Sequence, residues 1–68
     1  MDIKSALQSL VDGQSLSREA MRDVMTAVMT GKTSPAQIGA LLIALRIRGE
    51  TIDEIVGAAE VMRSLVNR

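Results

Sequence analysis

Hydrophobic residues recur along the chain at intervals of three and four positions, the spacing that places side chains on one face of an α-helix. No stretch alternates with the two-residue period that is typical of a β-strand. Glycines and cap-forming residues divide the pattern into four segments, which we expect to be helices at about 3–11, 18–30, 35–48 and 52–66. The sequence therefore predicts an all-α fold, a compact bundle of four short helices joined by short connections.

The later segments begin with the most specific helix signals in the chain. Ser34 precedes Pro35, and Gln37 stands where it completes a capping box. Thr51 and Glu54 form a second capping box at the start of the last segment. Glycine adopts the left-handed conformation that ends many helices. Three glycines are placed to end segments in this way: Gly13, Gly31 and Gly49.

The segment 35–48 is apolar on two sides, and between Pro35 and Leu45 its only polar side chain is Gln37. A helix that is apolar all round is buried all round. Either this helix runs through the middle of the bundle, or one of its stripes lies at an interface with another subunit or domain. The first stripe consists of Ile38, Leu41, Leu42 and Leu45, and the second of Ala36, Ala40, Ile43 and Ile47, with Gly39 beside it.

The segment 52–66 also carries two apolar strips. We expect the larger strip to face the core, and it consists of Ile52, Ile55, Val56, Ala59, Met62 and Val66. The smaller strip consists of Ala58, Val61 and Leu65, and we expect it to remain available to a partner. Because oligomers most often form about a two-fold axis, the leftover faces predict a homodimer. The candidate interface residues are Ala36, Gly39, Ala40, Ile43, Ile47, Ala58, Val61 and Leu65.

Composition excludes most kinds of chemistry. The 68 residues include no histidine, no cysteine and no aromatic residue. The usual tetrahedral zinc sites, Ser-His-Asp triads and disulfides are therefore excluded, as is a base-stacking platform for single-stranded nucleic acid. The formal net charge is zero, so we expect neither nucleic acid nor a membrane surface as a partner. The glycines are dispersed and form no phosphate-binding loop.

The acidic residues have plain structural explanations. Glu19 with Arg22, and Glu60 with Arg63, are three positions apart and predict surface ion pairs. The other acids at segment starts predict caps, so we expect no catalytic, cofactor-binding or metal-binding residue. The most apolar stretch, 38–45, is far shorter than the roughly 20 residues of a membrane span. The start of the chain does not resemble a signal peptide, and together with the lack of cysteine this predicts a cytoplasmic protein.

Several sequence motifs resemble those of a known family. The run SPAQIGALLIALRIRGETIDEIVGAAEVMR occupies 34–63, LVDGQSLSREAM occupies 10–21 and VMTG occupies 28–31. Together they resemble the N-terminal helical domain of the anthranilate phosphoribosyltransferases. Pyrimidine-nucleoside phosphorylases carry a related helical domain, but the PAQIGA and RGET motifs are more similar to the first family.

This resemblance implies a fold and a context for the chain. Full-length members transfer a phosphoribosyl group to anthranilate in tryptophan biosynthesis and use Mg²⁺. Their helical domain packs on a larger α/β catalytic domain and joins two subunits. Their Gly-Thr-Gly-Gly-Asp phosphate loop and metal-binding acids have no counterpart in 1–68. We therefore expect 1–68 to be a single domain, the N-terminal one of a two-domain enzyme, and inactive alone.

Two other interpretations remain open at this point. The chain is alternatively a free-standing homodimeric interaction module with no enzymatic context. It is alternatively the helical domain of a pyrimidine-nucleoside phosphorylase. The polypeptide that follows Arg68 distinguishes these possibilities.

Overall fold

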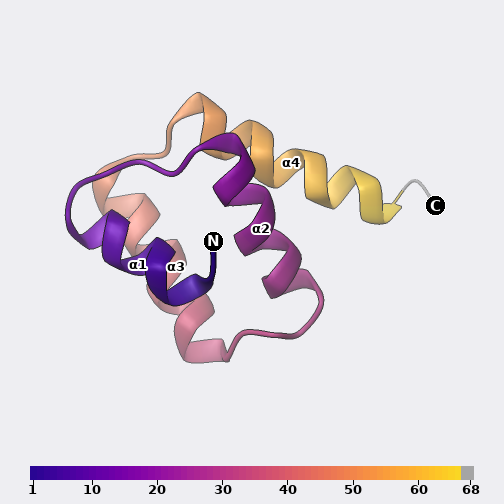
Figure 1. Cartoon of the computed structure of the whole chain (residues 1–68), viewed down its shortest axis with the longest axis horizontal. Helices are drawn as coiled ribbons and strands as arrows, with labels where there is room; N and C mark the ends of the chain where they lie inside the picture. Colours follow the sequence, from indigo (N-terminus) through magenta and orange to yellow (C-terminus); the bar gives the residue numbers. More distant parts are fainter. Residues whose placement is uncertain (67–68) are drawn as a thin grey trace.

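Four α-helices account for most of the chain in the computed structural model, which describes residues 1–66 (Figure 1). No strand occurs within this range, so the predicted all-α class is confirmed. The predicted boundaries also hold, except that the second helix ends one residue earlier than expected. The helices are α1 (Ile3–Val11), α2 (Arg18–Met29), α3 (Pro35–Arg48) and α4 (Ile52–Val66).

Local capping explains where the helices begin. The side chain of Asp2 accepts a hydrogen bond from the Ser5 amide at 2.8 Å, and thereby satisfies one of the free donors of the first turn of α1. At the start of α3, the Gln37 amide donates to the Ser34 hydroxyl at 3.1 Å, and the Ser34 amide donates to the Gln37 side chain at 3.0 Å. This reciprocal bonding confirms the predicted capping box. The three glycines predicted to end helices all have positive φ, between 75° and 88°.

The helices are arranged as two pairs. Helix α1 packs against α3, α2 packs against α4, and α1 also contacts α2 (Figure 1). Each of the three connections between helices therefore crosses from one pair to the other. The C-terminal part of α4 projects beyond the other helices (Figure 1). The whole molecule measures 36 × 25 × 18 Å.

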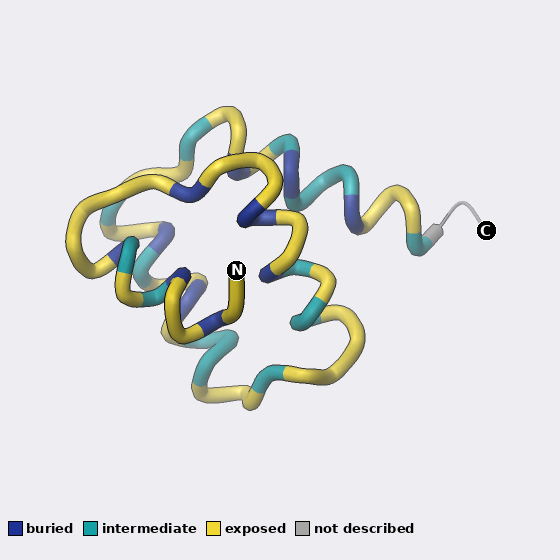
Figure 2. Tube along the Cα trace, in the orientation of Figure 1, coloured by how far each residue is buried: buried dark blue, intermediate teal, exposed yellow. Residues whose placement is uncertain are grey.

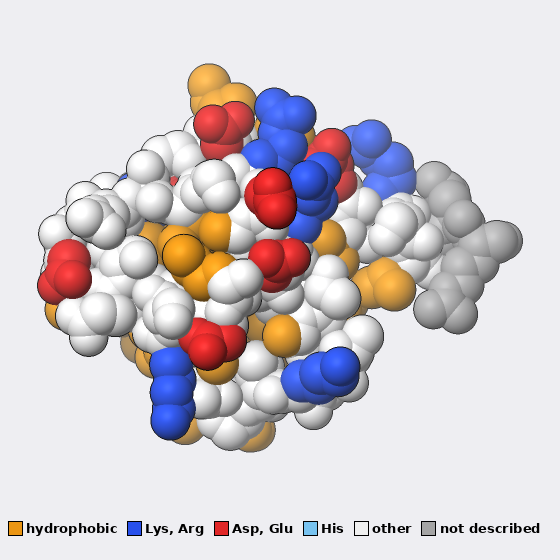
Figure 3. All heavy atoms as spheres, viewed as in Figure 1, with side chains coloured by type: hydrophobic (Ala, Val, Ile, Leu, Met, Phe, Trp, Pro, Cys, Tyr) orange, Lys and Arg blue, Asp and Glu red, His pale blue; other side chains and the backbone are white. Residues whose placement is uncertain are grey.

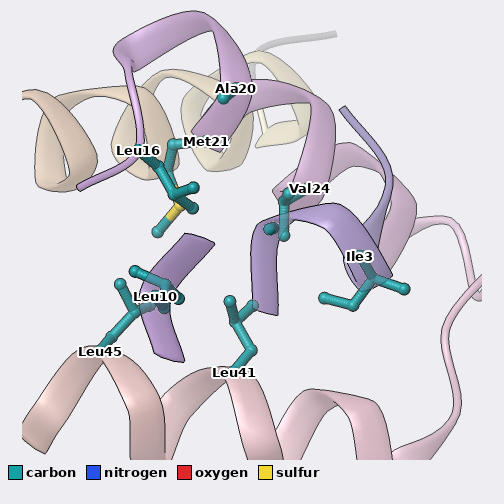
Figure 4. Packing of buried hydrophobic residues seen from close by; sticks show 9 residues of the cluster. Ile3, Leu10, Leu16, Ala20, Met21, Val24, Leu41 and Leu45 are labelled. Atoms are coloured by element: carbon teal, nitrogen blue, oxygen red, sulfur yellow. The ribbon is translucent and has the colours of Figure 1, made fainter. Parts of the chain in front are cut away.

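The hydrophobic core lies between the two pairs, and Figure 2 marks the buried positions along the backbone. Leu41 and Leu45 of α3 point towards Met21 of α2 and towards Leu16 (Figure 4). Leu16 lies in the connection before α2, as expected for a residue that packs over the first turn of a helix. The buried cluster consists of Ile3, Ala6, Leu10, Leu16, Ala20, Met21, Val24, Leu41 and Leu45.

Helix α3 buries only part of one predicted stripe. Leu41 and Leu45 are in the core, but Leu42 of the same stripe is 61% exposed. The reason is that α3 packs mainly on α1, so only one side of α3 is covered. Within residues 1–66 α3 is therefore not a central helix, and Ala36, Ala40, Ile43 and Ile47 of its second apolar stripe are exposed.

The prediction of which side of α4 faces the core was also wrong. Ile52, Ile55 and Met62 of the expected core strip are exposed, whereas Glu54, Gly57 and Val61 are buried. The side chain of Val66, expected in the same strip, lies outside the described part of the structure. Gly57 provides the physical reason, because the side of α4 without a Cβ can approach α2 most closely.

Candidate interaction surface

An apolar groove runs between the C-terminal end of α1 and the outer side of α3. Its volume is about 380 Å³. The walls are aliphatic apart from one arginine at the end of α3. The lining residues are Leu10, Val11, Ala40, Ile43, Ala44, Ile47 and Arg48.

The groove is bordered by large aliphatic side chains that are exposed to water in the single chain. Ile47 is 82% exposed, Ile43 is 61% exposed, and Val11 on the opposite wall is also exposed. Covering apolar surface is favourable by roughly 25 cal/mol per Å². Contiguous exposed apolar surface of this kind is typical of a site that binds another protein surface.

The structure separates the eight predicted interface residues into two groups. Ala40, Ile43 and Ile47 line the groove. Ala36 is exposed on the same helix, and a Cβ added at Gly39 would have no neighbour within 4 Å. The members on α4 lie elsewhere: Val61 is buried within the chain, and Ala58 and Leu65 are half-buried.

Sequence reasoning missed the other wall of this groove. Val11 and Leu10 come from α1, and they meet the α3 stripe only because α1 and α3 pack together. Val11 ends an apolar stripe of its own, so the sequence marked it as apolar. No local signal indicated which helix would lie beside it.

A second exposed apolar surface lies on α4, and we call it the α4 strip. It consists of Ile52, Ile55 and Met62, three residues on one side of the helix. Ile52 is 80% exposed. The α4 strip belongs to a different helix pair from the groove, so the domain presents two separate apolar surfaces.

Glu54 is the one charged residue in the described core, with a fully buried side chain. Its carboxylate accepts hydrogen bonds from the amide of Leu16 at 2.6 Å and from the amide of Thr51 at 2.8 Å. It also forms an ion pair with Arg48, whose side chain is largely buried. The Thr51–Glu54 capping box was predicted, but the contacts with Leu16 and Arg48 were not.

The surroundings of Glu54 stabilise its charged form. Burial raises the pKa of Glu54, but the hydrogen bonds from Arg48, Leu16 and Thr51 outweigh burial, so the pKa lies below its ordinary value. The carboxylate is consequently ionised at neutral pH. A buried charge that is fully hydrogen-bonded in this way is stable in place, but removing one partner is costly.

Among residues 1–66, charged side chains on the surface pair between helices rather than within one helix. Arg22 of α2 pairs with Glu60 of α4 at 3.2 Å, and Arg18 pairs with Asp53 at 3.6 Å. The predicted pairs of Arg22 with Glu19, and of Glu60 with Arg63, are therefore wrong. Figure 3 shows acidic and basic side chains interleaved where α2 and α4 lie. These side chains are partly exposed, so each pair stabilises the fold only slightly.

The described residues contain no group of three or more side chains that could hold a metal ion. In the same part of the chain, no helix combines the length and the apolar character needed to cross a bilayer. What the described surface offers is apolar contact area, in the groove and on the α4 strip.

Comparison with known proteins shows the family to which the chain belongs. The chain belongs to the glycosyl transferase family, as its helical bundle domain, and the family model matches residues 4–66. The chain is 59% identical over its whole length to an anthranilate phosphoribosyltransferase of Saccharophagus degradans and 57% identical to one of Pseudomonas entomophila. It is 62% identical over 65 residues, 96% of the chain, to one of Cellvibrio japonicus. The resemblance seen in the sequence motifs is thereby confirmed.

These relatives are much longer than the chain. It covers 20% of the first two relatives and 19% of the third. The chain thus spans about a fifth of the length of the curated relatives that it matches.

Proposed function

We propose that the chain is the N-terminal helical domain of an anthranilate phosphoribosyltransferase, and that it joins two subunits and supports the catalytic domain. The observation that carries this proposal is the groove on α3, which exposes Ile43 and Ile47 in a chain that matches a fifth of such enzymes. A domain of this size buries only about 60% of its unfolded surface, so covering further apolar area stabilises it.

The occupant proposed for the groove is a second copy of the chain. A two-fold axis brings the same patch of each subunit together, so that α3 of one copy packs against α3 of the other. Ala36, Gly39 and Ala40 have small or no side chains, and the space beside Gly39 is open. Two such helices can approach closely and insert the isoleucines of each into the apolar wall of the other.

The occupant proposed for the α4 strip is the α/β catalytic domain of the same enzyme. The strip lies on the opposite helix pair from the groove, so one surface can contact the second subunit while the other contacts the catalytic domain. This division explains why both faces are exposed in the helical domain alone.

In the proposed enzyme, the amine nitrogen of anthranilate attacks the anomeric carbon of phosphoribosyl pyrophosphate. A carbon–nitrogen bond forms, the carbon–oxygen bond to pyrophosphate breaks, and the amine loses a proton. The described residues contain no cluster that fits Mg²⁺ and no aromatic side chain to stack on anthranilate. The proposal therefore assigns the metal and the reacting groups to the rest of the enzyme, in the cytoplasm, and expects 1–68 alone to be inactive.

Reading the source gene beyond the codon for Arg68 tests this proposal. We expect an open frame encoding an α/β domain with a Gly-Thr-Gly-Gly-Asp loop. The full-length product should consume anthranilate in the presence of phosphoribosyl pyrophosphate and Mg²⁺, as followed by fluorescence, whereas 1–68 should not. An immediate stop codon would support a free-standing dimerisation module, and phosphorolysis of a pyrimidine nucleoside would identify the other enzyme family. Either of these results would overturn the proposal.

A further inference from the structure

The three connections between the helix pairs lie at two ends of the molecule. Those at 12–17 and 49–51 run along the same side in Figure 1, and the one at 30–34 runs along the opposite edge. Whatever ties the first two connections together therefore fixes how the α1/α3 pair sits on the α2/α4 pair at that end.

The carboxylate of Glu54 makes this tie. It accepts a hydrogen bond from the Leu16 amide in the first of these connections, at 2.6 Å, and one from the Thr51 amide in the other, at 2.8 Å. Its ion pair with Arg48 adds the last residue of α3. A single buried side chain on α4 thus holds the end of α3 and both neighbouring connections.

We infer that Glu54 and Arg48 form a clamp that sets the angle between the two helix pairs, and with it the relative orientation of the groove and the α4 strip. Arg48 links the clamp to the groove directly, because it also lines the groove. Glu54 acts here as a positioning residue. The clamp lies within this chain and acts whatever occupies either surface.

The clamp requires a carboxylate rather than another polar side chain. All the partners of Glu54 are donors: the amides of Leu16 and Thr51 and the guanidinium of Arg48. An ionised carboxylate only accepts hydrogen bonds and has two oxygens to do so. The side chain in Glu54→Gln has one acceptor oxygen, and its NH₂ group would face a donor, which leaves buried groups without partners.

Distances between spin labels test the clamp. The chain has no cysteine, so introduced cysteines give unique labelling sites. Labels at the exposed positions Arg46→Cys and Arg63→Cys measure the distance between α3 and α4, and labels at Thr26→Cys and Arg63→Cys measure a distance within the α2/α4 pair. Labelled chain is diluted with unlabelled chain so that only distances within one chain are read.

We expect Glu54→Gln to shift and broaden the α3–α4 distance while the distance within the α2/α4 pair stays as it was. The matched control is Glu60→Gln, the same substitution on the same helix at a surface ion pair, and it should leave both distances unchanged. Unchanged α3–α4 distances in Glu54→Gln, or equal broadening of both distances, would overturn the inference.

Hydrogen exchange at the Leu16 amide gives a second readout, and Arg48→Lys gives a milder variant if Glu54→Gln does not fold. Leu16 precedes the N-cap of α2, and its amide is bonded to Glu54 rather than to a helix carbonyl. In Arg48→Lys its exchange should accelerate by at least about tenfold more than that of Val24 within α2. Equal acceleration at both amides would mean that the ion pair only adds general stability, and would overturn the inference.

Discussion

Gly57 of α4 lies in direct contact with the backbone of Arg18 at the start of α2. A Cβ added at Gly57 would lie 2.6 Å from the carbonyl oxygen of Arg18 and 3.1 Å from the Cβ of Met21. Real Cβ atoms do not approach a backbone oxygen so closely, so α2 and α4 pack at this distance only because residue 57 is glycine. The contact also explains which side of α4 faces the core.

Replacing Gly57 by alanine should separate α2 from α4 and destabilise the chain. We expect Gly57→Ala to lower the free energy of unfolding by about 2 kcal/mol, the cost of overpacking a well-filled interior. The measurement is urea denaturation followed by circular dichroism.

Gly39→Ala is the matched control for this substitution. Gly39 also lies inside a helix, but a Cβ there has open space. At concentrations low enough for the chain to be single, alanine should therefore raise the free energy of unfolding by roughly 0.5–1 kcal/mol through its greater helix propensity. Changes of the same sign in the two variants would contradict this account of α2–α4 packing.

The lowered pKa of Glu54 predicts how the stability of the chain depends on pH. The carboxylate binds its proton more readily in the unfolded chain, so its contribution is complete above about pH 5 and is lost as pH falls through the folded-state pKa. At neutral pH, Glu54→Gln should lower the free energy of unfolding by about 3 kcal/mol, because Arg48 loses its buried partner.

The difference between the unaltered chain and Glu54→Gln should therefore shrink as the solution becomes more acidic. Asp2, whose pKa is lowered by its hydrogen bond from the Ser5 amide, also responds to acid. It is present in both chains, so its effect cancels in the comparison. A stability difference that stayed constant from pH 7 down to pH values well below the ordinary pKa of glutamate, about 4.3, would disprove this role for the charge.

The surface ion pair between Arg22 and Glu60 should contribute far less. Both side chains are more than a third exposed, and exposed pairs contribute roughly 0.2–1 kcal/mol. We expect Glu60→Gln to change the free energy of unfolding by less than about 1 kcal/mol, and the change to diminish as salt is added. A loss comparable to that of Glu54→Gln would show that burial does not distinguish the two pairs.

Neighbouring leucines on α3 should respond differently to an introduced charge. Leu41→Asp places an unpaired carboxylate in the core and should cost several kcal/mol, enough to unfold so small a domain. Leu42→Asp changes a side chain that is 61% exposed and should leave the helix content intact. Circular dichroism distinguishes the outcomes, and unfolding by both variants would contradict the observed orientation of α3.

The helix boundaries could be predicted from the sequence because capping is local. Ser34, Pro35 and Gln37 lie within four positions of one another, and the capping box they form depends on no distant part of the chain. The glycines that end helices act over one or two residues in the same way. These signals therefore gave the correct number of helices and, apart from one residue, the correct limits.

The core-facing side of α4 could not be predicted because it depends on distant contacts. Counting apolar residues favoured the strip with Ile52 and Ile55, but the buried side contains Glu54 and Gly57. Glu54 can be buried because donors that include the amide of Leu16, 38 positions away, satisfy its carboxylate. For the same reason the groove was only half predicted, since its α1 wall depends on the packing of α1 against α3.

The central claim is that the groove on α3 joins two copies of the chain, and the mass in solution tests it most directly. Sedimentation of the chain at high concentration should give twice the 7.3 kDa mass of a single chain. Ile43→Asp, inside the groove, should give a folded single chain, whereas Leu42→Asp, equally exposed but outside the groove, should still give the dimer. A folded 7.3 kDa species for the unaltered chain, or equal dissociation by both substitutions, would contradict the account.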